Sequence, residues 1–580
     1  MRGSEVLVKM LSLYRVDTIF GVPGDTSLPL YEALYDSDGS IRHVPARDER
    51  CASFMADAYA RITHRPGICE CPSGAGALYS IPGIAEADAA SIPVILFTSD
   101  NPISGEGKKT ITEIDCQRLF EPVTKWSALV KDTQLIPEII RRAFRIATTG
   151  RPGAVHLAFP QEVLTGTWQG DEKTLYAESE CSGYPAFRTR GSRESLEQLA
   201  KILRVSQKPV IVAGGGARHA QAKQEIRELA TLLNAPVVTT ISGQGIMPDD
   251  HPLALGVIGD NGFHPHAVRA VEESDTMLYI GCKMGSVSTM KWTLPSYDPE
   301  RALLQIDLDP VMLGNNYKNR VSVAGDARLV TRDLCSLLAD MKPKPGRWVD
   351  DLNAQRRAFW HKAQTAMSSS STPIKPQRVI AAVNRHLTGN SIVISDAGTP
   401  TPFITRYLRL KGDASFFIIP RAFGGLGYAI PAVAGAWFAL PGATLVGFFG
   451  DGSLGMSAGE LETLARYRIP CVLIHFNNSC FGWIKALQAI HTQGKFFSVD
   501  FTPGDPCLVA RGFGLKAIRV NDPETLDAAL DEAFAHQGPV FVDITTESEV
   551  TELPPVYSWM KATGKTSSTI LETVTKDIDG

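Results

Sequence analysis

The sequence lacks long hydrophobic runs and a signal peptide. No uninterrupted run of 18 or more hydrophobic residues occurs among its 580 residues, so no segment is predicted to span a membrane. Residues 1–24 have the pattern of an amphipathic helix followed by a strand, which differs from that of a signal peptide. We therefore expect a cytoplasmic protein with no membrane partner.

An excess of one charge sign is also absent. The 58 Lys and Arg residues nearly balance the 62 Asp and Glu residues, which leaves a formal net charge of −4. This balance gives no electrostatic basis for binding nucleic acid or an anionic membrane. With 44% hydrophobic and 21% charged residues the composition is typical of a globular enzyme, and the length of 580 residues suggests three or four domains.

Cysteine pairs of the redox or zinc-binding kind are missing too. The ten cysteines include no Cys-x-x-Cys motif, and the closest two, Cys69 and Cys71, would point to the same face of one strand. We therefore expect reduced, buried thiols, with neither disulfides nor a zinc site.

Strand-like and helix-like segments alternate along most of the chain. This alternation predicts the α/β fold class, with three doubly wound, mostly parallel sheets. The strands are expected at residues 18–22, 42–45, 67–71, 93–97, 154–158, 209–213, 276–280, 302–307, 392–395, 444–449 and 471–476. The predicted domains span residues 1–165, 190–342 and 373–550, and residues 551–580 form a carboxy-terminal extension.

The most informative motif lies in the third of these domains. The sequence Gly-Asp-Gly-Ser at residues 450–453 follows an apolar run, and Asn478 follows a second apolar run 27 residues after Asp451 (478 − 451 = 27). The glycines leave room for a phosphate to approach the backbone, and the carboxylate is a hard oxygen ligand. A glycine-rich turn beside an unrelated Asn pair is the simpler alternative.

The spacing favours a binding site over that alternative. It fits one strand–helix–strand unit, in which Ser457 and Glu460 have the spacing of a capping box at the start of the helix. The carboxyl ends of neighbouring parallel strands lie together, so Asp451 and Asn478 can contact one cation. The sequence therefore predicts a magnesium diphosphate site.

These motifs resemble those of the thiamin diphosphate (ThDP) enzymes of the acetolactate synthase and 2-oxo acid decarboxylase family. Further matching pieces are FGVPGD at 20–25, Asp-Glu-Arg at 48–50 and MADAYAR at 55–61, and the resemblance covers roughly residues 4–550. It implies a pyrimidine-binding domain, a central Rossmann-like domain and a diphosphate-binding domain, in that order. It also implies active sites between two subunits, and so a homodimer or homotetramer.

The resemblance assigns the cofactor site residue by residue. In the family an Asp, an Asn and a backbone carbonyl two residues later hold Mg²⁺, which here implies Asp451, Asn478 and Cys480, where the family usually has Gly. Leu426 corresponds to the apolar residue that wedges beneath the cofactor, although an ordinary core leucine would fit the pattern too. The residues expected to bind the cofactor are Glu49, Gly398, Thr399, Leu426, Gly450, Asp451, Gly452, Ser453, Asn478 and Cys480.

Two of these assignments have plainer alternatives. Gly398 and Thr399 follow a predicted strand, where either a diphosphate contact or a plain turn accounts for them. Glu49 corresponds to the family's catalytic glutamate, whose carboxyl hydrogen-bonds N1′ of the aminopyrimidine and so assists removal of the C2 proton. A solvated glutamate favoured by the helix dipole is the alternative reading of Glu49.

The substrate end of the site gives mixed signals. Asp25 follows Pro-Gly, as in the family's decarboxylases, where this Asp serves in proton transfer to the enamine. Those decarboxylases also carry adjacent histidines in a loop that here spans residues 108–115 and has none. Thr112 stands in that loop where synthases have a Gln, so we count it as a catalytic candidate with Asp25 and Glu49.

The expected reaction is ThDP- and Mg-dependent decarboxylation of a 2-oxo acid, after which the enamine is protonated or ligated to a second carbonyl. A 2-hydroxyacyl-CoA lyase or oxalyl-CoA decarboxylase type of reaction on an acyl-CoA substrate is the alternative within the family. A non-catalytic relative that keeps the fold for regulation is the alternative outside enzyme catalysis, although both Glu49 and Asp451 are present.

The central domain raises the question of a second cofactor. Synthases of the family bind FAD there, partly through an Arg that is missing from residues 281–292 of this chain. We therefore favour structural packing over FAD binding as the role of the three glycines at 214–216. His264 and His266 are expected on a surface loop, and a reach toward the substrate is the less favoured alternative.

Overall fold

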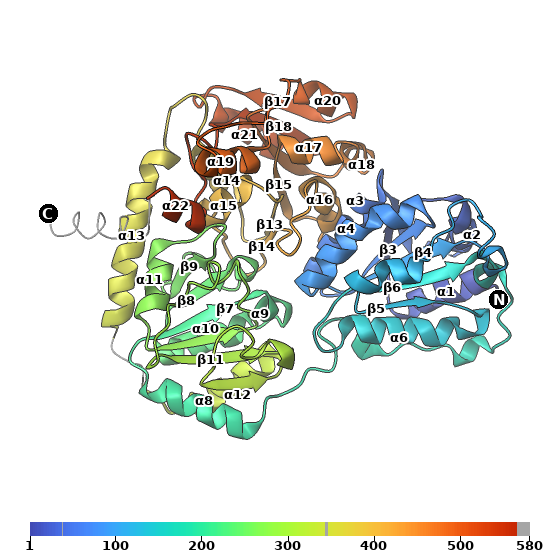
Figure 1. Cartoon of the computed structure of the whole chain (residues 1–580), viewed down its shortest axis with the longest axis horizontal. Helices are drawn as coiled ribbons and strands as arrows, with labels where there is room; N and C mark the ends of the chain where they lie inside the picture. The colour runs from blue at the N-terminus through green and yellow to red at the C-terminus, as the bar shows by residue number, and fades with distance from the viewer. Residues whose placement is uncertain (38, 343–345, 565–580) are drawn as a thin grey trace.

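The computed structural model describes residues 1–37, 39–342 and 346–564, and it contains three six-stranded sheets (Figure 1). Neighbouring strands in each sheet pair in parallel, as between β1 (Thr18–Gly21) and β3 (Gly67–Pro72). Helices cover the sheets, which is required of parallel sheets because both faces are apolar. The predicted α/β class with three doubly wound domains is confirmed, whereas the domain boundaries stay predictions.

The first sheet has two strands on one side of β3 and three on the other. Its order is β2 (Arg42–Pro45), β1, β3, β4 (Val94–Asp100), β6 (Val155–Pro160) and β5 (Trp126–Leu129). The main helices are α1 (Gly3–Leu13), α2 (Leu28–Asp36), α3 (Glu49–Thr63), α4 (Ala75–Ala90) and α6 (Ile136–Thr148). The strand β5 was not predicted, because four residues at a sheet edge give little periodicity.

The second sheet has the strand order of a dinucleotide-binding Rossmann fold. Its order is β12 (Val321–Ala324), β11 (Ala302–Asp307), β10 (Thr276–Ile280), β7 (Pro209–Ala213), β8 (Val237–Thr240) and β9 (Ala254–Ile258). The covering helices include α8 (Arg193–Val205), α10 (Lys223–Leu233), α11 (Pro265–Glu273) and α12 (Ala327–Leu338). The sequence placed β7, β10 and β11 at the residues observed.

The third sheet repeats the strand order of the first. Its order is β14 (Phe416–Ile418), β13 (Ser391–Ser395), β15 (Thr444–Gly450), β16 (Cys471–Asn477), β18 (Pro539–Thr545) and β17 (Lys516–Val520). Its helices include α14 (Pro376–His386), α15 (Pro400–Tyr407), α16 (Ala429–Ala439), α17 (Asp451–Ser457), α18 (Glu460–Arg466), α19 (Gly482–His491), α20 (Pro506–Gly512) and α21 (Leu526–Ala535). The chain order reverses between β13 and β15, so ligands are expected at the carboxyl ends of these strands.

The predicted capping box is wrong. Ser457 ends α17 and its hydroxyl donates to the carbonyl of Ser453 (3.1 Å). Glu460 begins the separate helix α18, and its carboxylate accepts from the backbone N–H of Arg47 (2.7 Å) in the first domain. The glutamate is therefore used in a contact between domains, which the local sequence does not reveal.

Two further helices lie apart from the three sheets. The helix α13 (Arg347–Met367) runs along the outer side of the second and third domains (Figure 1). The helix α22 (Tyr557–Ala562) lies in the predicted extension and packs on α19, where the rings of Trp559 and Trp483 are 4.4 Å apart. Residues 565–580 of that extension lie outside the described residues.

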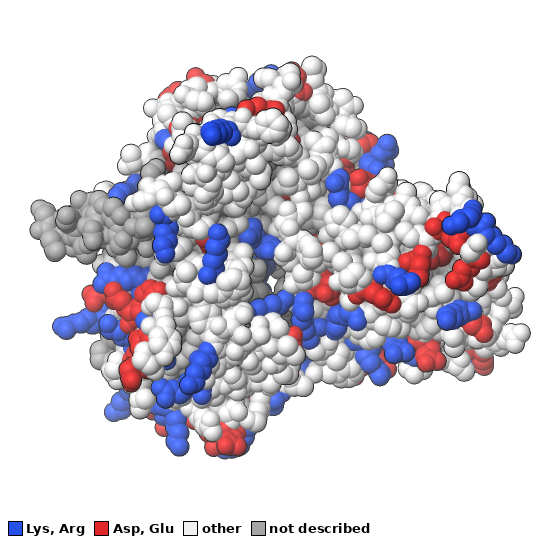
Figure 2. All heavy atoms as spheres, in the orientation of Figure 1, with Lys and Arg blue, Asp and Glu red and all other residues white. Residues whose placement is uncertain are grey.

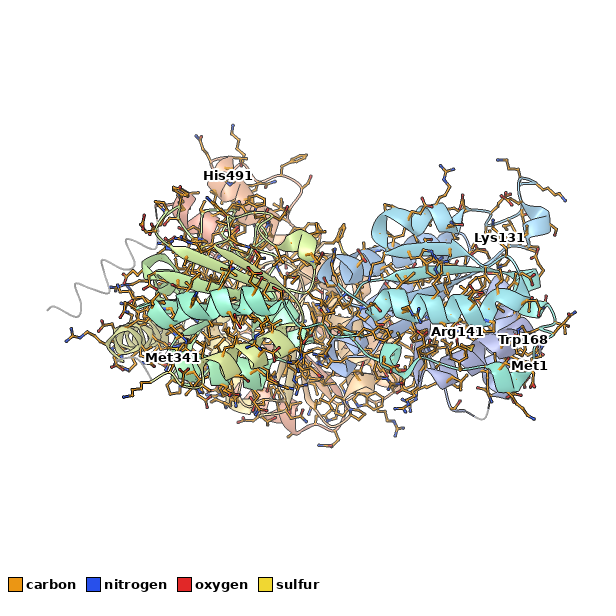
Figure 3. The ribbon with its side chains drawn as sticks, turned by 90° about the horizontal axis from the view of Figure 1, so that it is seen from below. Met1, Lys131, Arg141, Trp168, Met341 and His491 are labelled. Atoms are coloured by element: carbon orange, nitrogen blue, oxygen red, sulfur yellow. The ribbon has the colours of Figure 1, made fainter. Side chains whose placement is uncertain are left out.

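The charges on the surface are as evenly mixed as the composition suggests. Figure 2 shows both charge signs interspersed on the visible face, with neither sign covering a whole domain. Seen from below, Met1 and Trp168 lie together at the outer end of the first domain, where Trp168 N donates to Met1 O (2.8 Å), while His491 lies toward the other end (Figure 3). Among the described residues, none of the helices combines the length and the apolar character needed to cross a membrane.

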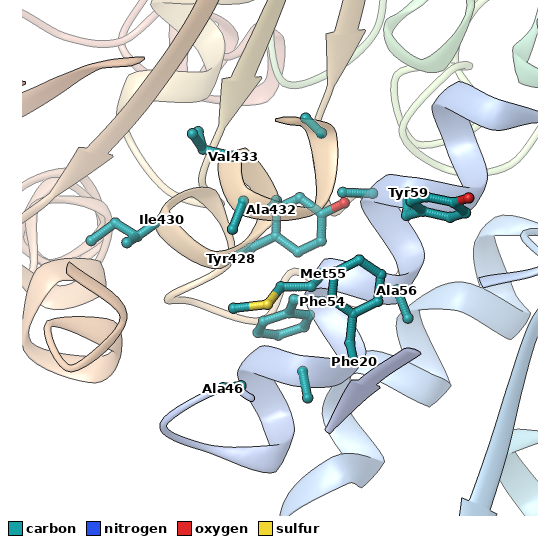
Figure 4. Packing of buried hydrophobic residues seen from close by; sticks show 14 of the residues in the cluster. Phe20, Ala46, Phe54, Met55, Ala56, Tyr59, Tyr428, Ile430, Ala432 and Val433 are labelled. Atoms are coloured by element: carbon teal, nitrogen blue, oxygen red, sulfur yellow. The ribbon is translucent and has the colours of Figure 1, made fainter. Parts of the chain in front are cut away.

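The first and third domains share one hydrophobic core. Phe54 and Met55 of α3 pack against Tyr428 and Ala432 at the start of α16 (Figure 4). The backbones approach so closely that a Cβ atom on Gly435 would lie 2.2 Å from the carbonyl oxygen of Met55. The two domains of one chain are thus joined through α3 and α16.

We predict that Gly435→Ala destabilises the protein, because the added methyl group must push α16 away from α3. The expected loss is about 1–3 kcal/mol in the free energy of unfolding, seen as a lower thermal midpoint. Gly512→Ala in α20 is the matched control, since nothing lies within 4 Å of the Cβ position there. An equal thermal midpoint for Gly435→Ala and wild type would contradict the close packing.

Candidate active site

The tips of β13, β15 and β16 enclose a cavity of about 460 Å³ in the third domain. Every cofactor residue predicted in that domain lines it, namely Gly398, Thr399, Leu426, Gly450, Asp451, Gly452, Ser453, Asn478 and Cys480. The structure therefore brings these residues together, while their individual roles stay predictions.

Asp451 ties two strand tips together. It is the first residue of α17, directly after β15, and its Oδ2 accepts from the backbone N–H groups of Asn478 (3.0 Å) and Ser479 (3.1 Å) that follow β16. Its Oδ1 lies 3.6 Å from Nε2 of His475. Burial raises the pKa of Asp451. A cation bound nearby would have the opposite effect and favour the charged carboxylate.

The amide of Asn478 has a defined orientation. Its Nδ2 donates to Oε2 of Glu549 (2.9 Å), and its Oδ1 contacts the thiol of Cys480 (3.0 Å). The amide oxygen is therefore on the same side as Cys480, the residue whose carbonyl was predicted as the third metal ligand.

The donor set fits a magnesium ion. A carboxylate, an amide oxygen and a backbone carbonyl are the hard oxygen donors that Mg²⁺ prefers. Within the described residues no group of three or more His, Cys, Asp and Glu side chains is placed to hold a metal. The predicted set differs in kind from such a group, because only Asp451 contributes a side chain of those types.

Leu426 lies in a loop that is held from two sides. The carboxylate of Asp396 accepts from the N–H groups of Gly427 (3.2 Å) and Ala429 (2.9 Å), just after this leucine. Glu86 of the first domain accepts from three N–H groups just before it, those of residues 422–424. Leu426 itself is only partly buried and lines the cavity, so it is not an ordinary core leucine.

The Gly398 turn is required by the backbone. Gly398 has a φ of 113°, which side chains rarely tolerate, in the turn that leads from β13 into α15. Thr399 follows it as the N-cap residue of α15, and its hydroxyl donates to Oε1 of Glu549 (2.6 Å). The backbone geometry alone therefore explains why residue 398 is a glycine. Because Gly398 also lines the cavity, a contact with a diphosphate stays a prediction.

Sequence reasoning missed two carboxylates of this site, Asp396 and Glu549. Asp396 is fully buried behind the Leu426 loop, and burial raises its pKa to about 7. It belongs to the same Asp-Ala-Gly-Thr motif as Gly398, so the sequence drew attention to this segment. The motif does not indicate that the Asp396 side chain is buried. Glu549 lies 71 residues after Asn478 (549 − 478 = 71) in a segment without a recognisable motif.

Glu49 lies at the equivalent edge of the first sheet. It begins α3 after β2, with Asp48 as the N-cap residue that accepts from Arg50 N (2.8 Å). Burial raises the pKa of the half-buried Glu49, and the charges of Asp48 and Glu70 raise it further. A raised pKa suits a carboxyl group that exchanges a proton near neutral pH.

Asp25 and Thr112 lie at the same edge as Glu49. Pro72, at the end of β3, is packed between the Cα atoms of Gly24 and Gly76, and a Cβ atom on Gly76 would lie 3.0 Å from Oε1 of Glu49. The hydroxyl of Thr112 lies 2.9 Å from that of Ser73, next to Pro72. Asp25 and Thr112 are both exposed. None of the three catalytic candidates lines the 460 Å³ cavity of the same chain.

Both expectations for His264 and His266 are wrong. The two rings are buried between the second and third domains, where Nδ1 of His264 accepts from Val257 N (3.0 Å) and its Nε2 donates to Arg406 O (2.8 Å). Burial lowers the pKa of His264 to about 3. The pair is thus a neutral, buried structural element, and neither ring lines the 460 Å³ cavity.

Close packing explains two of the three glycines at 214–216. A Cβ atom on Gly214 would lie 2.2 Å from the carbonyl oxygen of Gly281, and one on Gly216 would lie 2.9 Å from the Cα atom of Gly281. A second cavity of about 800 Å³ lies beside them between the three domains, and Arg218, Lys223 and Lys283 contribute to its lining.

Comparison with known proteins tests the family. Three family models match in chain order: the thiamine pyrophosphate enzyme N-terminal TPP binding domain at residues 1–119, the central domain at 196–334 and the C-terminal TPP binding domain at 396–544. A probable acetolactate synthase large subunit of Methanocaldococcus jannaschii is 34% identical over 94% of this chain and 92% of its own length.

The chain belongs to the thiamine pyrophosphate enzyme family. The acetolactate synthase isozyme 3 large subunit of Escherichia coli is 31% identical over 94% of this chain and 95% of its own length. An acetolactate synthase of Mycobacterium bovis is 30% identical over 96% and 90%. Thiamine pyrophosphate is ThDP, so the family resemblance read from the motifs is confirmed.

The predicted site residues fall within two different family models. The N-terminal model covers Asp25, Glu49 and Thr112, and the C-terminal model begins at Asp396 and extends past Cys480. It ends at residue 544, before Glu549. The match to the family model therefore includes Asn478 but not its partner Glu549.

Asp396 provides a pH-dependent test of the Leu426 loop. Its pKa rises from 3.8 to about 7 on folding, so between these pH values the unfolded chain has lost a proton that the folded chain keeps. Stability from the neutral carboxyl group is therefore fully present below pH ~4 and is lost as the pH rises towards 7.

We predict that Asp396→Asn, which cannot titrate, has a lower thermal midpoint than wild type at pH 5, since its amide accepts fewer N–H groups. The difference should shrink as the pH rises to 7, because only wild type loses stability over that range. Thermal melts of both proteins across this pH range measure the difference, and a gap that widens would contradict the buried neutral carboxyl group.

Proposed function

We propose that this chain is an acetolactate synthase-like enzyme that decarboxylates a 2-oxo acid with ThDP and Mg²⁺. The observation that carries the proposal is the cavity at the tips of β13, β15 and β16, which gathers every cofactor residue expected in the third domain. Relatives named as acetolactate synthase large subunits match nearly the whole chain, which supports the same reaction class.

In this proposal Asp451, Asn478 and the carbonyl of Cys480 hold Mg²⁺, and N–H groups of residues 452–453 at the start of α17 contact the diphosphate. When bound, ThDP supplies the C2 carbon that attacks the carbonyl group of the 2-oxo acid. Leu426, whose loop is held from both sides by Asp396 and Glu86, would support the bound cofactor at the cavity wall.

The positions of the catalytic candidates support a site shared between two copies of the chain. Glu49 does not line the cavity of its own chain, and its domain is joined to the third domain through α3 and α16. We propose a homodimer, or a homotetramer built from it, in which Glu49 of one copy faces the cavity of the other. There Glu49 would hold a proton at N1′ of the cofactor.

The fate of the decarboxylated unit depends on Asp25 and Thr112. Asp25 favours protonation to an aldehyde, whereas the near full-length relatives favour ligation to a second carbonyl. We place ligation first, because Asp25 and Thr112 lie at the same sheet edge as Glu49 without the adjacent histidines of the decarboxylases. No feature of the described residues favours an acyl-CoA substrate over a 2-oxo acid.

FAD is not part of the proposed cofactor set, because residues 281–292 lack the Arg of the FAD-binding synthases and packing against Gly281 accounts for Gly214 and Gly216. We place the enzyme in the cytoplasm, because all ten cysteines are buried and unpaired, as expected of a reducing compartment.

The proposal predicts release of CO2 from 2-oxo acids, dependent on both ThDP and Mg²⁺. A panel of 2-oxo acids, alone and in pairs, would be assayed for CO2 and for acetolactate-like and aldehyde products. A 2-hydroxy-2-oxo acid product is the expected result. Turnover of no 2-oxo acid under any of these conditions would contradict the proposed function.

Glu49→Gln tests the catalytic glutamate. The amide cannot share a proton with N1′, so exchange of the cofactor C2 proton should slow by roughly 10²–10⁴-fold. Binding of ThDP in the presence of Mg²⁺ should survive, because the proposed metal and diphosphate ligands in the third domain are unchanged. The exchange is measured by NMR in deuterated buffer, and an unchanged rate would remove Glu49 from this role.

A further inference from the structure

Glu549 connects two parts of the cofactor cavity that come from different strands. Its Oε1 accepts from the hydroxyl of Thr399 (2.6 Å), which follows β13, and its Oε2 accepts from Nδ2 of Asn478 (2.9 Å), which follows β16. The strand β15, which leads directly into Asp451, lies between β13 and β16 in the sheet. One carboxylate thus spans the tip that carries the predicted metal ligand.

The position of this carboxylate is built into the fold. Glu549 is 6% exposed, and its carboxylate lies so close to the backbone of Gly482 that a Cβ atom there would be 2.2 Å from Oε1. Gly482 begins α19, which packs beside α22 in Figure 1. A side chain at position 482 would therefore displace the carboxylate from the cavity wall.

The segment around Glu549 is fastened on both sides of it. Nζ of Lys375 donates to Glu547 (3.0 Å) and to Glu552, and Nε2 of Gln377 also donates to Glu552 (2.7 Å). Both donors lie at the start of the third domain, at and just before α14. The segment is thus anchored independently of the two contacts that Glu549 makes in the cavity.

The chemical consequence concerns the amide of Asn478. An amide group can be turned over about its terminal bond, and only its oxygen can ligate a cation. A carboxylate accepts hydrogen bonds and donates none, so Glu549 selects the orientation in which Nδ2 faces it. The oxygen then lies near Cys480, whose carbonyl completes the proposed ligand set.

We propose that Glu549 is a positioning residue, which holds the Asn478 oxygen toward Mg²⁺ and the Thr399 hydroxyl in the cavity wall. This inference rests on the proposed ThDP and Mg²⁺ site. Glu549 is not itself assigned as a ligand, because it lies on the Nδ2 side of the Asn478 amide. Partners of this kind orient metal ligands and typically contribute about 10–100-fold to metal affinity.

The test measures ThDP binding by calorimetry at a series of Mg²⁺ concentrations, without any turnover. Glu549→Ala should raise the Mg²⁺ concentration for half-maximal binding by about 10–100-fold. Glu549→Gln should stay close to wild type, because its amide oxygen still accepts from Nδ2 and its amide nitrogen can donate to the Thr399 hydroxyl. Thermal melts without cofactor show whether each variant is folded.

Glu552→Ala is the matched control, since Glu552 anchors the same segment and lies outside the cavity lining. It should bind Mg²⁺ like wild type. If it weakens binding as much as Glu549→Ala does, order of the segment and not orientation of the amide is responsible, and the inference is overturned.

The background Asn478→Asp separates positioning from general support. Both oxygens of the introduced carboxylate are equivalent, so there is no orientation to select, and this carboxylate would repel that of Glu549. Adding Glu549→Ala in this background should leave Mg²⁺ affinity unchanged or improve it, whereas loss of general support would weaken it again.

Wild type that fails to bind ThDP with Mg²⁺ would overturn the proposed function, while wild type and Glu549→Ala that bind equally would overturn only the role of Glu549.

Discussion

The site depends on the hydrogen bonds from the Asn478 and Ser479 N–H groups to the carboxylate of Asp451. They bring the tips of β15 and β16 together. The other oxygen of Asp451 lies 3.6 Å from Nε2 of His475, and the amide oxygen of Asn478 contacts the thiol of Cys480. Burial of a carboxylate costs free energy unless it gains hydrogen bonds or a cation. The turn at residues 450–453 thus creates an acidic, preorganised position, and this is where the proposed divalent ion and diphosphate would bind.

The packing of the first domain on the third keeps Glu49 apart from the cavity within one chain. Packing of α3 on α16 and the contacts of Glu86 with residues 422–424 hold the Leu426 loop from the first domain. The same arrangement leaves Glu49 at a different sheet edge, away from the cavity of its own chain. In the proposed homodimer, cofactor support would therefore be provided within one copy, while the acid–base group would come from the other.

Local features of the sequence predicted the fold and the cofactor cavity well. The strands β7, β10 and β11 coincide with apolar runs, and the residues around Asp451 and Asn478 form one contiguous strand–helix–strand unit. Features that depend on distant contacts could not be predicted. Glu460 bonds to Arg47 across the domain boundary, His264 is buried against Arg406, and Glu549 reaches Asn478 from a segment with no motif. In each case the partner is far away in sequence, so periodicity and spacing do not indicate it.

The most direct test is a crystal structure of the protein with ThDP and Mn²⁺, in which anomalous scattering locates the metal. The account predicts one metal peak at coordination distance from Asp451, the amide oxygen of Asn478 and the carbonyl of Cys480, bridging to the diphosphate. It also predicts that Glu49 of a second copy faces the aminopyrimidine. A metal peak away from Asp451, or a cofactor bound elsewhere than between the tips of β13, β15 and β16, would contradict the account.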